Sequence, residues 1–493
     1  MVPFHLELKN ECIMKNIFLL FLSLLILNSC TNKSEKDKKK LNERISRIEN
    51  GLQSNLQIKY GDNRPIPTFN IEERMQELKI PGLSIAVLNN GVIEWAKGYG
   101  IADSLENRKV TTETLFQAGS ISKPVAATGI LQLVDKNLVD LDVNVNTYLS
   151  SWKLPDNEFT KKEKVTLRRI LNHTAGTTIG GFLGYKRGEK IPSVPEILDG
   201  KGNTDSVRVY KEPGKSWRYS GGGYTIMQQM VSDIEQKQFP EIMQKNLLDP
   251  LGMKSSTFKN PLPEEYHSIA AAGYNFDGTQ VEGKWWVYPE MAAAGLWTTP
   301  SELILWGKEI QQIFQTQKDG LLKAKTVNEM LTANDDDQGL GPYVLKHTFG
   351  HGGADEGFRA DFTAWKETPN AVVIMVNSQN GNIIIKEILL SIAQEYNLQG
   401  IEPRTRVFKE QSKEQLRRFV GKYHFPENGD AKIVIKDNGL EFTGEIFSTP
   451  IFLLPETDST FFNKNSGTRY TFKFEGDSIT SVKFSRFEAK KIK

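Results

Sequence analysis

The stretch Leu115-Phe116-Gln117-Ala118-Gly119-Ser120-Ile121-Ser122-Lys123 ends in the pattern Ser-x-x-Lys. Apolar residues recur at helical spacing from Val125 to Val134, so we expect a buried helix that begins near Ser120. Residues three apart share a helix face, so the Ser120 hydroxyl can contact the Lys123 amine. Burial lowers the pKa of a lysine, and a neutral lysine can take the proton that activates a serine. Most such pairs are solvated surface residues, but the apolar surroundings favour a catalytic pair here.

Two further stretches complete the pattern. Tyr219-Ser220-Gly221 lies in a glycine-rich segment before a predicted helix, and His351-Gly352-Gly353 lies in a second glycine-rich segment. The order Ser-x-x-Lys, Tyr-Ser-x, His-Gly-Gly resembles the serine β-lactamase and penicillin-binding-protein family, in its class C-like branch. That branch includes class C β-lactamases, D-Ala-D-Ala carboxypeptidases, D-aminopeptidases and family VIII esterases.

Other segments extend the resemblance over most of the chain. Residues 80–87 and 95–100 look like the family's first strand pair, and Leu171-Asn172-His173-Thr174-Ala175-Gly176 is similar to its L-x-H-T-S-G segment. Residues 249–258 and 293–302 are similar to two further family segments. Together the matches span roughly residues 71–398.

The resemblance implies a role for each motif residue. Ser120 is expected to be the acylated nucleophile, and Lys123 to share and relay its proton. Tyr219 is expected to be the second general acid and base, with a phenol pKa lowered by nearby cations. His351 takes the place of the lysine in the family's K-T-G motif.

The same resemblance implies the substrate contacts. The backbone N–H groups of Ser120 and Ala354 are expected to form the oxyanion hole. The expected substrate-binding residues are Gly352, Gly353, Gly221 and Asn172. Gly221 departs from the family, which usually has Asn there to hold the substrate amide, and Asn172 or Gln117 could compensate. The change speaks against amide substrates, including β-lactams.

Blander interpretations exist for several of these side chains. Tyr219 could be a core aromatic residue, and His351 could be structural or a zinc ligand with His347. The zinc interpretation is weak because the segment is glycine-rich and carries no H-E-x-x-H or Cys cluster. We therefore expect no metal and no cofactor, and we expect structural or rim roles for the side chains His173, Glu290 and Asp355.

Composition narrows the class of partners. The chain has 493 residues, which suggests two or three domains, and its 62 Lys and Arg nearly balance its 60 Asp and Glu. This balance gives no electrostatic case for nucleic acid, and no phosphate-binding glycine motif is present. The expected partner is a small-molecule or peptide substrate, and the sequence does not set the oligomeric state.

The first residues predict export. Met14-Lys15-Asn16 precedes an apolar run over residues 17–27, and Leu27-Asn28-Ser29-Cys30 resembles a bacterial lipoprotein signal. We expect a signal peptide over residues 1–29 with its true start at Met14, then lipidated Cys30 and a solvated tether through residue 60. A signal-anchor helix and a plain cleaved signal are the alternatives. The expected address is the bacterial cell envelope, as a periplasmic or surface-facing lipoprotein whose membrane contact is a lipid anchor.

The expected fold class is α+β. Strands at 83–88, 92–98, 362–365 and 371–376, with helices at 43–57, 71–78 and 383–396, predict an antiparallel sheet flanked by helices. An all-α lobe is expected between residues 120 and 244, within a catalytic domain at 61–403. Period-2 alternation predicts a small all-β barrel-like domain at 410–493, similar to lipocalin-like appendages of this family. Its predicted strands are 421–424, 432–436, 440–443, 451–455, 460–463, 468–474 and 478–485.

The leading hypothesis is an exported serine hydrolase that forms an acyl-enzyme at Ser120 and cleaves an ester or a D-amino-acid peptide bond. The first alternative is a β-lactamase or a penicillin-binding DD-peptidase. The second is a non-catalytic cell-envelope binding protein that keeps the fold.

Overall fold

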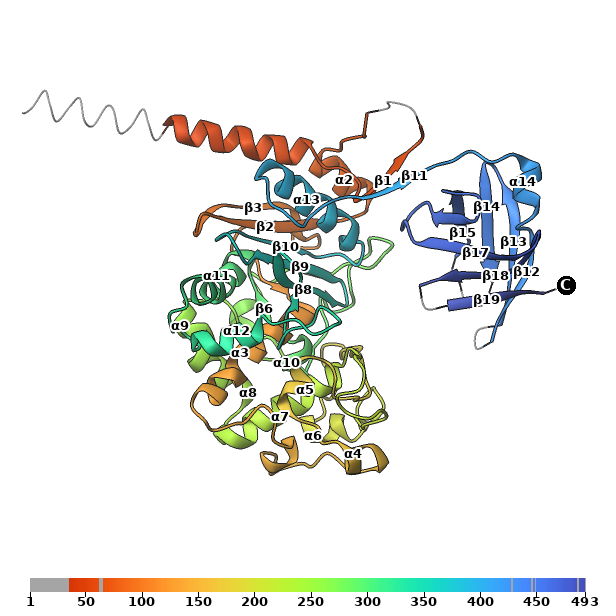
Figure 1. The fold of residues 1–493 in the computed structure, drawn as a ribbon. Coiled ribbons are helices and arrows are strands. Elements are labelled where there is room, and N and C mark those ends of the chain that lie inside the picture. The colour runs from red at the N-terminus through yellow and green to blue at the C-terminus, as the bar shows by residue number, and fades with distance from the viewer. Residues whose placement is uncertain are drawn as a thin grey trace, which may run out of the picture.

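The computed structural model describes residues 35–61, 65–426, 429–444, 447, 449–485 and 487–492. Its main feature is a seven-stranded antiparallel sheet in the order β4-β3-β2-β10-β9-β8-β7. Strands from both ends of the domain meet in this sheet, as the sequence predicted (Figure 1). They are β2 (Gly82–Asn89), β3 (Val92–Asp103), β4 (Arg108–Lys109), β7 (Tyr343–Val344), β8 (Thr348–Asp355), β9 (Phe358–Trp365) and β10 (Ala371–Val376).

The turn between β2 and β3 follows from its residues. Asn90 and Gly91 have φ angles of 50° and 77°, which suit the two-residue turns that match the twist of a hairpin. The central strands β2 and β10 pair with each other and are buried along almost their whole length. Their continuous apolar runs fit strands that are covered on both faces. The four strands predicted for this sheet are confirmed.

Helices cover the two faces with separate apolar clusters. On one face, α2 (Ile71–Glu77), α13 (Gly381–Glu395) and the helix of residues 35–50 pack against β2 and β10. On the other face lies α11 (Pro300–Thr316), where the Trp306 ring lies 4.9 Å from the Phe362 ring of β9. The helices predicted at 71–78 and 383–396 are confirmed to within about two residues.

The segment before this domain differs from the prediction. We expected a helix over residues 43–57, but the helix covers residues 35–50 and is followed by β1 (Leu56–Lys59). Lys and Glu are good helix formers, so the charged composition of residues 35–43 did not require an extended tether. The predicted signal over residues 1–29 and Cys30 lie outside the described residues. In the described ranges, no helix is long and apolar enough to cross a membrane.

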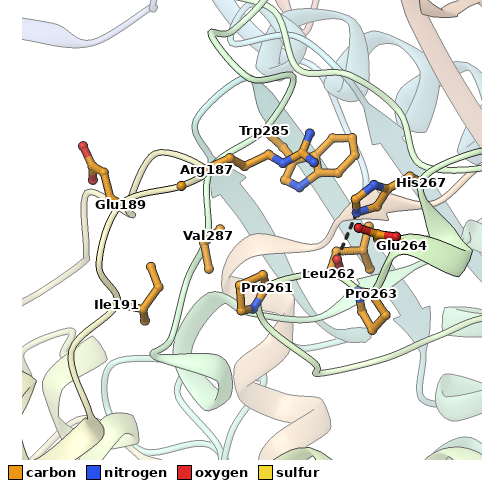
Figure 2. Close-up of a pocket in the computed structure, with 11 residues that line it drawn as sticks. Arg187, Glu189, Ile191, Pro261, Leu262, Pro263, Glu264, His267, Trp285 and Val287 are labelled. Carbon is orange, nitrogen blue, oxygen red and sulfur yellow. Dashed lines mark hydrogen bonds between the residues drawn. The ribbon is translucent and has the colours of Figure 1, made fainter.

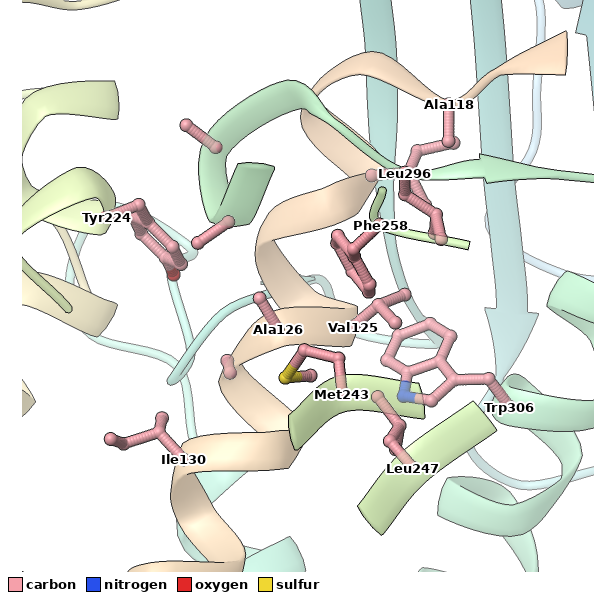
Figure 3. Close-up of a cluster of buried hydrophobic side chains, with 14 of the residues drawn as sticks. Ala118, Val125, Ala126, Ile130, Tyr224, Met243, Leu247, Phe258, Leu296 and Trp306 are labelled. Atoms are coloured by element: carbon pink, nitrogen blue, oxygen red, sulfur yellow. The ribbon is translucent and has the colours of Figure 1, made fainter. Parts of the chain in front are cut away.

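The helical lobe is organised around α3 (Ser122–Asp135), which is buried on almost all sides. Figure 3 shows Val125 of this helix on the side of Phe258 and Trp306, and Ile130 on its other side, within one apolar cluster. The other elements are α4 (Glu158–Lys162), α5 (Leu167–Leu171), α6 (Val194–Leu198), α7 (Gly221–Glu235), α8 (Phe239–Met243), α9 (Asp249–Leu251), α10 (Met291–Ala294), α12 (Ala324–Met330), the short helices η1 (Gly119–Ile121), η2 (Val145–Thr147), η3 (Gln244–Leu248) and η4 (Glu264–Tyr266), and the strand pair β5 (Phe116–Gln117) and β6 (Trp297–Thr298).

The C-terminal part is a closed eight-stranded antiparallel barrel. The seven predicted strands are confirmed, and an eighth, β19, was missed because its short, Lys-rich sequence alternates only weakly. β19 pairs with both β18 and β12 and so closes the barrel. Buried aromatic rings fill the interior. The elements are α14 (Lys413–Arg417), β12 (Gly421–Phe425), β13 (Gly429–Lys436), β14 (Gly439–Gly444), β15 (Ile451–Pro455), β16 (Thr460–Asn463), β17 (Arg469–Glu475), β18 (Ser478–Phe484) and β19 (Phe487–Ile492).

A pair of parallel strands joins the two parts. β1 pairs with β11 (Arg404–Val407), the segment that leads from the sheet domain to the barrel (Figure 1). Arg404 donates to the Ser466 carbonyl oxygen at 2.9 Å, and Arg406 donates to the Gly467 carbonyl oxygen at 2.8 Å. These contacts hold one barrel loop against the strand pair, so we call β1 and β11 the strap.

Candidate active site

The turn that carries Ser120 packs directly on strand β8. Gly119 has a φ of +53°, and a Cβ there would lie 2.5 Å from the Ala354 nitrogen. A Cβ on Gly353 would lie 2.0 Å from the Ala118 carbonyl oxygen. Only glycine permits so close an approach of two backbones. The glycines flanking the motifs therefore set the position of Ser120 against β8.

Lys123 lies beside Ser120, as its spacing predicted. Its side chain is 2% exposed, and its Nζ donates to Ser120 Oγ at 3.0 Å and to the Ala293 carbonyl oxygen at 2.8 Å. Burial lowers the pKa of Lys123 to about 7, and the charge of Asp355 acts weakly in the opposite direction. A lysine with such a pKa is largely a free base just above neutral pH.

Tyr219 reaches the same point from a position two residues before α7. Its side chain forms a hydrogen bond with Ser120, and the Lys123 Nζ lies 4.8 Å from the centre of its ring. We expected nearby cations to lower the phenol pKa, and this was wrong. Burial raises the pKa of Tyr219 above its usual range, and the hydrogen bond from Ser120 only partly offsets this. The phenol is therefore neutral and is a proton donor.

His351 lies on β8 and faces the same pocket. One ring nitrogen, Nδ1, lies 2.6 Å from the Gly352 carbonyl oxygen and must donate to it, because a carbonyl oxygen only accepts. Nε2 is buried and has no hydrogen-bond partner among the described residues. Burial and the nearby Lys123 lower the pKa of His351 to about 3. The imidazole is thus a neutral acceptor and does not replace the charge of a lysine.

The register of β8 shows where the Ala354 N–H points. Asp355 and Phe358 flank the two-residue turn to β9, so they form a hydrogen-bonded pair, and the next pair, Ala354 with Arg359, is not hydrogen-bonded. The Ala354 N–H therefore points away from β9, toward the turn that holds Ser120. The N–H of Ser120, at the start of a helix, has no intrahelical acceptor.

A cavity of about 440 Å³ opens over these groups. It includes Gly352 and Gly353 but neither Gly221 nor Asn172 among its lining residues. The Asn172 side chain accepts instead from Thr174 at 2.7 Å, within its own turn. The lining residues are Ser120, Tyr219, Tyr343, His351, Gly352, Gly353, Ala354, Ala360, Asp361, Asn382, Ile385 and Lys386.

Several polar lining residues were missed at the sequence level. Asn382 and Lys386 are exposed and lie four apart on α13, and this spacing, which puts both on one helix face, is the signal that could have found them. Asp361 lies opposite Gly352 on β9 and accepts from Thr363 at 2.7 Å. Burial raises the pKa of Asp361 to about 6.

A second cavity of about 370 Å³ continues from the first. The two share Tyr343, His351, Gly352, Asp361 and Lys386, and the second also includes residues 55 and 402 near the strap. The groove therefore extends well past Ser120, toward the joint between the two parts of the chain.

The aromatic cluster around Trp285 lies outside the cavity that opens over Ser120. Trp285 is buried beside Trp297, with ring centres 5.3 Å apart, and the Arg187 guanidinium lies 4.5 Å from a Trp285 ring centre. A separate cavity of about 390 Å³ lies at this point (Figure 2), and it contains none of the residues that surround Ser120. Trp285 is thus a packing residue.

His173, Glu290 and Asp355, for which we expected structural or rim roles, are all buried. His173 accepts the Ser220 N–H at 3.2 Å, and its ring centre lies 4.5 Å from that of Tyr219. Glu290 and Asp355 are both buried near the site. In the ranges that the structure describes, no three His, Cys, Asp or Glu side chains come together as a metal site.

The fold and this cluster define a class of protein: a β-lactamase-fold hydrolase with its Ser, Lys and Tyr beside the sheet edge. The Beta-lactamase family model matches residues 70–386, and the chain belongs to this family. Residues 405–493, which include the barrel, match a domain of unknown function, DUF3471.

One relative by sequence and two solved structures illustrate what this chain is similar to. Penicillin-binding protein 4* of Bacillus subtilis (strain 168) is 26% identical over 210 residues, which is 42% of this chain and 44% of that protein. A solved octameric penicillin-binding protein homologue from Pyrococcus abyssi is 21% identical with a TM-score of 0.57, and the match covers 85% of this chain and 97% of that chain. A structure of SurE with D-Leu has the same coverage, with 19% identity and a TM-score of 0.54. These two structures establish the fold.

Proposed function

We propose that the protein is an exported serine hydrolase that forms an acyl-enzyme at Ser120. The observation that carries this proposal is the contact between the Lys123 Nζ and Ser120 Oγ at 3.0 Å, with the lysine pKa lowered to about 7. A nucleophile in hydrogen-bond contact with a base of matched pKa is the arrangement that covalent catalysis requires.

The first half-reaction follows from the geometry. Neutral Lys123 takes the proton of the Ser120 hydroxyl as Oγ attacks the substrate carbonyl carbon. The N–H groups of Ser120 and Ala354 bind the oxyanion, and such a donor typically contributes about 3–4 kcal/mol to the transition state. Tyr219 gives its proton to the leaving oxygen or nitrogen and regains one from Lys123. The products are the leaving alcohol or amine and an ester on Ser120.

The second half-reaction reverses the proton transfers. Lys123, acting through Tyr219, takes a proton from the attacking water as its oxygen adds to the acyl carbon. Collapse of the intermediate breaks the bond to Ser120 Oγ, which recovers its proton, and the carboxylic acid product leaves. His351 lines the cavity and carries no charge in this scheme.

The proposed substrate is an ester or a D-amino-acid peptide. Gly221 carries no side-chain amide to hold a substrate amide, which favours the ester of these two, and a Cβ there would lie 3.1 Å from the Phe182 ring. The Lys386 ammonium at the rim of the cavity suits a carboxylate on the substrate. The similar SurE structure was solved with D-Leu, which favours a D-amino acid over its L isomer.

Two alternatives remain, and one of them has specific support. The relative named as a penicillin-binding protein favours a β-lactamase or DD-peptidase. A non-catalytic binding protein would need neither the low lysine pKa nor the hydrogen bonds at Ser120, so we rank it lower.

We place the protein in the cell envelope through lipidated Cys30. Metabolic labelling with a fatty acid, compared between wild type and Cys30→Ala, tests this.

The experiment compares wild type with Ser120→Ala on p-nitrophenyl butyrate, on D- and L-aminoacyl p-nitroanilides, and on a fluorescent penicillin. We expect ester hydrolysis, and cleavage of the D over the L anilide, in wild type alone. A stable penicillin adduct on wild type alone would favour the DD-peptidase alternative, and penicillin destruction would favour a β-lactamase. No turnover of any substrate and no adduct would leave the binding-protein alternative.

A further inference from the structure

Asp355 is a buried carboxyl group that the mechanism above does not use. It is the last residue of β8 and is 6% exposed. Its side chain accepts a hydrogen bond from the Gly119 backbone N–H, while Oδ2 has no partner within the described part of the chain. A buried carboxyl group with a free oxygen is costly, so its presence beside the nucleophile calls for a reason.

We propose that Asp355 is a positioning residue that fastens the two halves of the oxyanion hole together and couples its charge to Lys123. This inference rests on the proposed acyl-enzyme function and deepens it. It assigns a role to a side chain that neither touches substrate nor takes part in the proton transfers.

The covalent connectivity supports the fastening role. Gly119 precedes Ser120 and Asp355 follows Ala354, so the hydrogen bond between them lies one residue from each oxyanion donor. The two backbones already pack at the limit of contact, with room only for glycine at 119 and 353. This packing prevents the two backbones from moving closer together, but it does not prevent them from moving apart. The hydrogen bond from Gly119 to Asp355 supplies the attraction that keeps both N–H groups aimed at one point.

The electrostatic surroundings support the second role. Asp355 faces Lys123 of α3, Arg359 of β9 and Glu290 before α10, and its charge also acts on Tyr219 and Tyr288. Burial raises the pKa of Asp355 well above its usual range, and Lys123 and Arg359 oppose this rise. In return, Asp355 raises the pKa of Lys123 against the larger effect of burial. The two groups are therefore coupled, and a change at one moves the titration of the other.

An asparagine would make the same hydrogen bond without a charge. Its side-chain oxygen accepts from the Gly119 N–H, and a neutral amide costs less to bury than a carboxylate. If positioning were the only task, Asp355→Asn would be silent. The negative charge of Asp355 leads to a second expectation. In Asp355→Asn the pKa of Lys123 should fall, because the ammonium loses one favourable interaction.

The test measures kcat and KM for p-nitrophenyl butyrate between pH 5 and pH 9, using the full chain purified in detergent. Asp355→Asn should keep kcat above pH 8 within about threefold of wild type, and should move the acid limb of kcat/KM lower by at least about half a pH unit. Asp355→Ala should lower kcat by about 10- to 100-fold with KM changed less than about threefold, because the oxyanion donors lose their alignment.

Glu290→Gln is the matched control. Glu290 is at least as deeply buried, but it is not among the charges that act on Lys123, whereas Asp355 is. Its replacement should leave the midpoint of the acid limb in place. Thermal melting shows whether each variant is folded. If Asp355→Ala does not fold, the pH profile of Asp355→Asn still tests the role of Asp355.

The outcomes separate the inference from the proposed function. Ester hydrolysis that survives in Ser120→Ala would refute the acyl-enzyme. Loss of activity in Ser120→Ala, with an unmoved acid limb in Asp355→Asn or an unchanged kcat in a folded Asp355→Ala, would overturn only the role of Asp355.

Discussion

Replacing Lys123 by Met should stabilise the protein while abolishing its activity. The lysine is 2% exposed, and burial lowers its pKa from the ordinary value of 10.5 to about 7. Below pH 7 the native state must keep an ammonium ion out of water. The shift of about 3.5 pH units corresponds to about 5 kcal/mol of native-state cost at 1.36 kcal/mol per unit. This is an upper bound on the gain, since Met also gives up the hydrogen bonds to Ser120 and Ala293.

The pH dependence separates this effect from packing. Between pH 7 and pH 10.5 the unfolded chain binds a proton on Lys123 that the native state does not. The stability of wild type therefore rises with pH through this window, by about 1.36 kcal/mol per unit for this group. Met does not titrate, so the advantage of Lys123→Met should shrink by about 2.3 kcal/mol between pH 7, where the native lysine is half protonated, and pH 9. Cavity and packing effects are the same at both pH values and cancel.

Urea unfolding followed by tryptophan fluorescence at pH 6, 7, 8 and 9 measures this difference. Lys136→Met is the matched control, because Lys136 is exposed at the end of the same helix. Its difference from wild type should not change with pH in this way. If the advantage of Lys123→Met is the same at pH 7 and pH 9, the lysine is not depressed in pKa, and its role as a neutral base loses its basis.

Three further predictions concern single groups. Tyr219→Phe should lower kcat by about 10²–10⁴-fold without unfolding the protein, measured by ester hydrolysis and thermal melting, because it removes only the proton donor; an unchanged kcat would contradict that role. Gly353→Ala should lower the melting temperature by several degrees, since its Cβ would lie 2.0 Å from a carbonyl oxygen, whereas Gly352→Ala has no atom within 3.8 Å and should not. Gly467→Ala should speed limited proteolysis between the strap and β12, because its Cβ would lie 2.6 Å from the Leu56 side chain of β1. Gly476→Ala, with a similar positive φ and no neighbour within 4 Å among the described residues, should not; equal rates would contradict the strap contact.

The hairpin and the helix that carries Lys123 could be predicted because their causes are local. Asn90 and Gly91 determine their turn, and the Ser120–Lys123 spacing determines a contact on one helix face. The seven barrel strands with clear alternation were found for the same reason. The eighth, β19, was missed because it forms by closing the barrel rather than through its own pattern.

The site chemistry was harder to predict, because it depends on burial by distant segments. The pKa of Tyr219 rises because the fold removes the phenol from water, and no local pattern contains this information. Lys386 and Asp361 reach the cavity from α13 and β9, more than 240 residues after Ser120 in the chain. Asn172 was assigned to substrate, but its side chain accepts from Thr174 instead.

A single measurement tests the proposed acyl-enzyme at Ser120. Intact-protein mass is recorded after p-nitrophenyl butyrate is mixed with wild type and with Ser120→Ala and quenched in acid within milliseconds. We predict one butyryl group per wild-type chain, located on Ser120 by peptide mapping, and none on the variant. Release of p-nitrophenol at equal rates by both proteins, with no adduct on either, would contradict it.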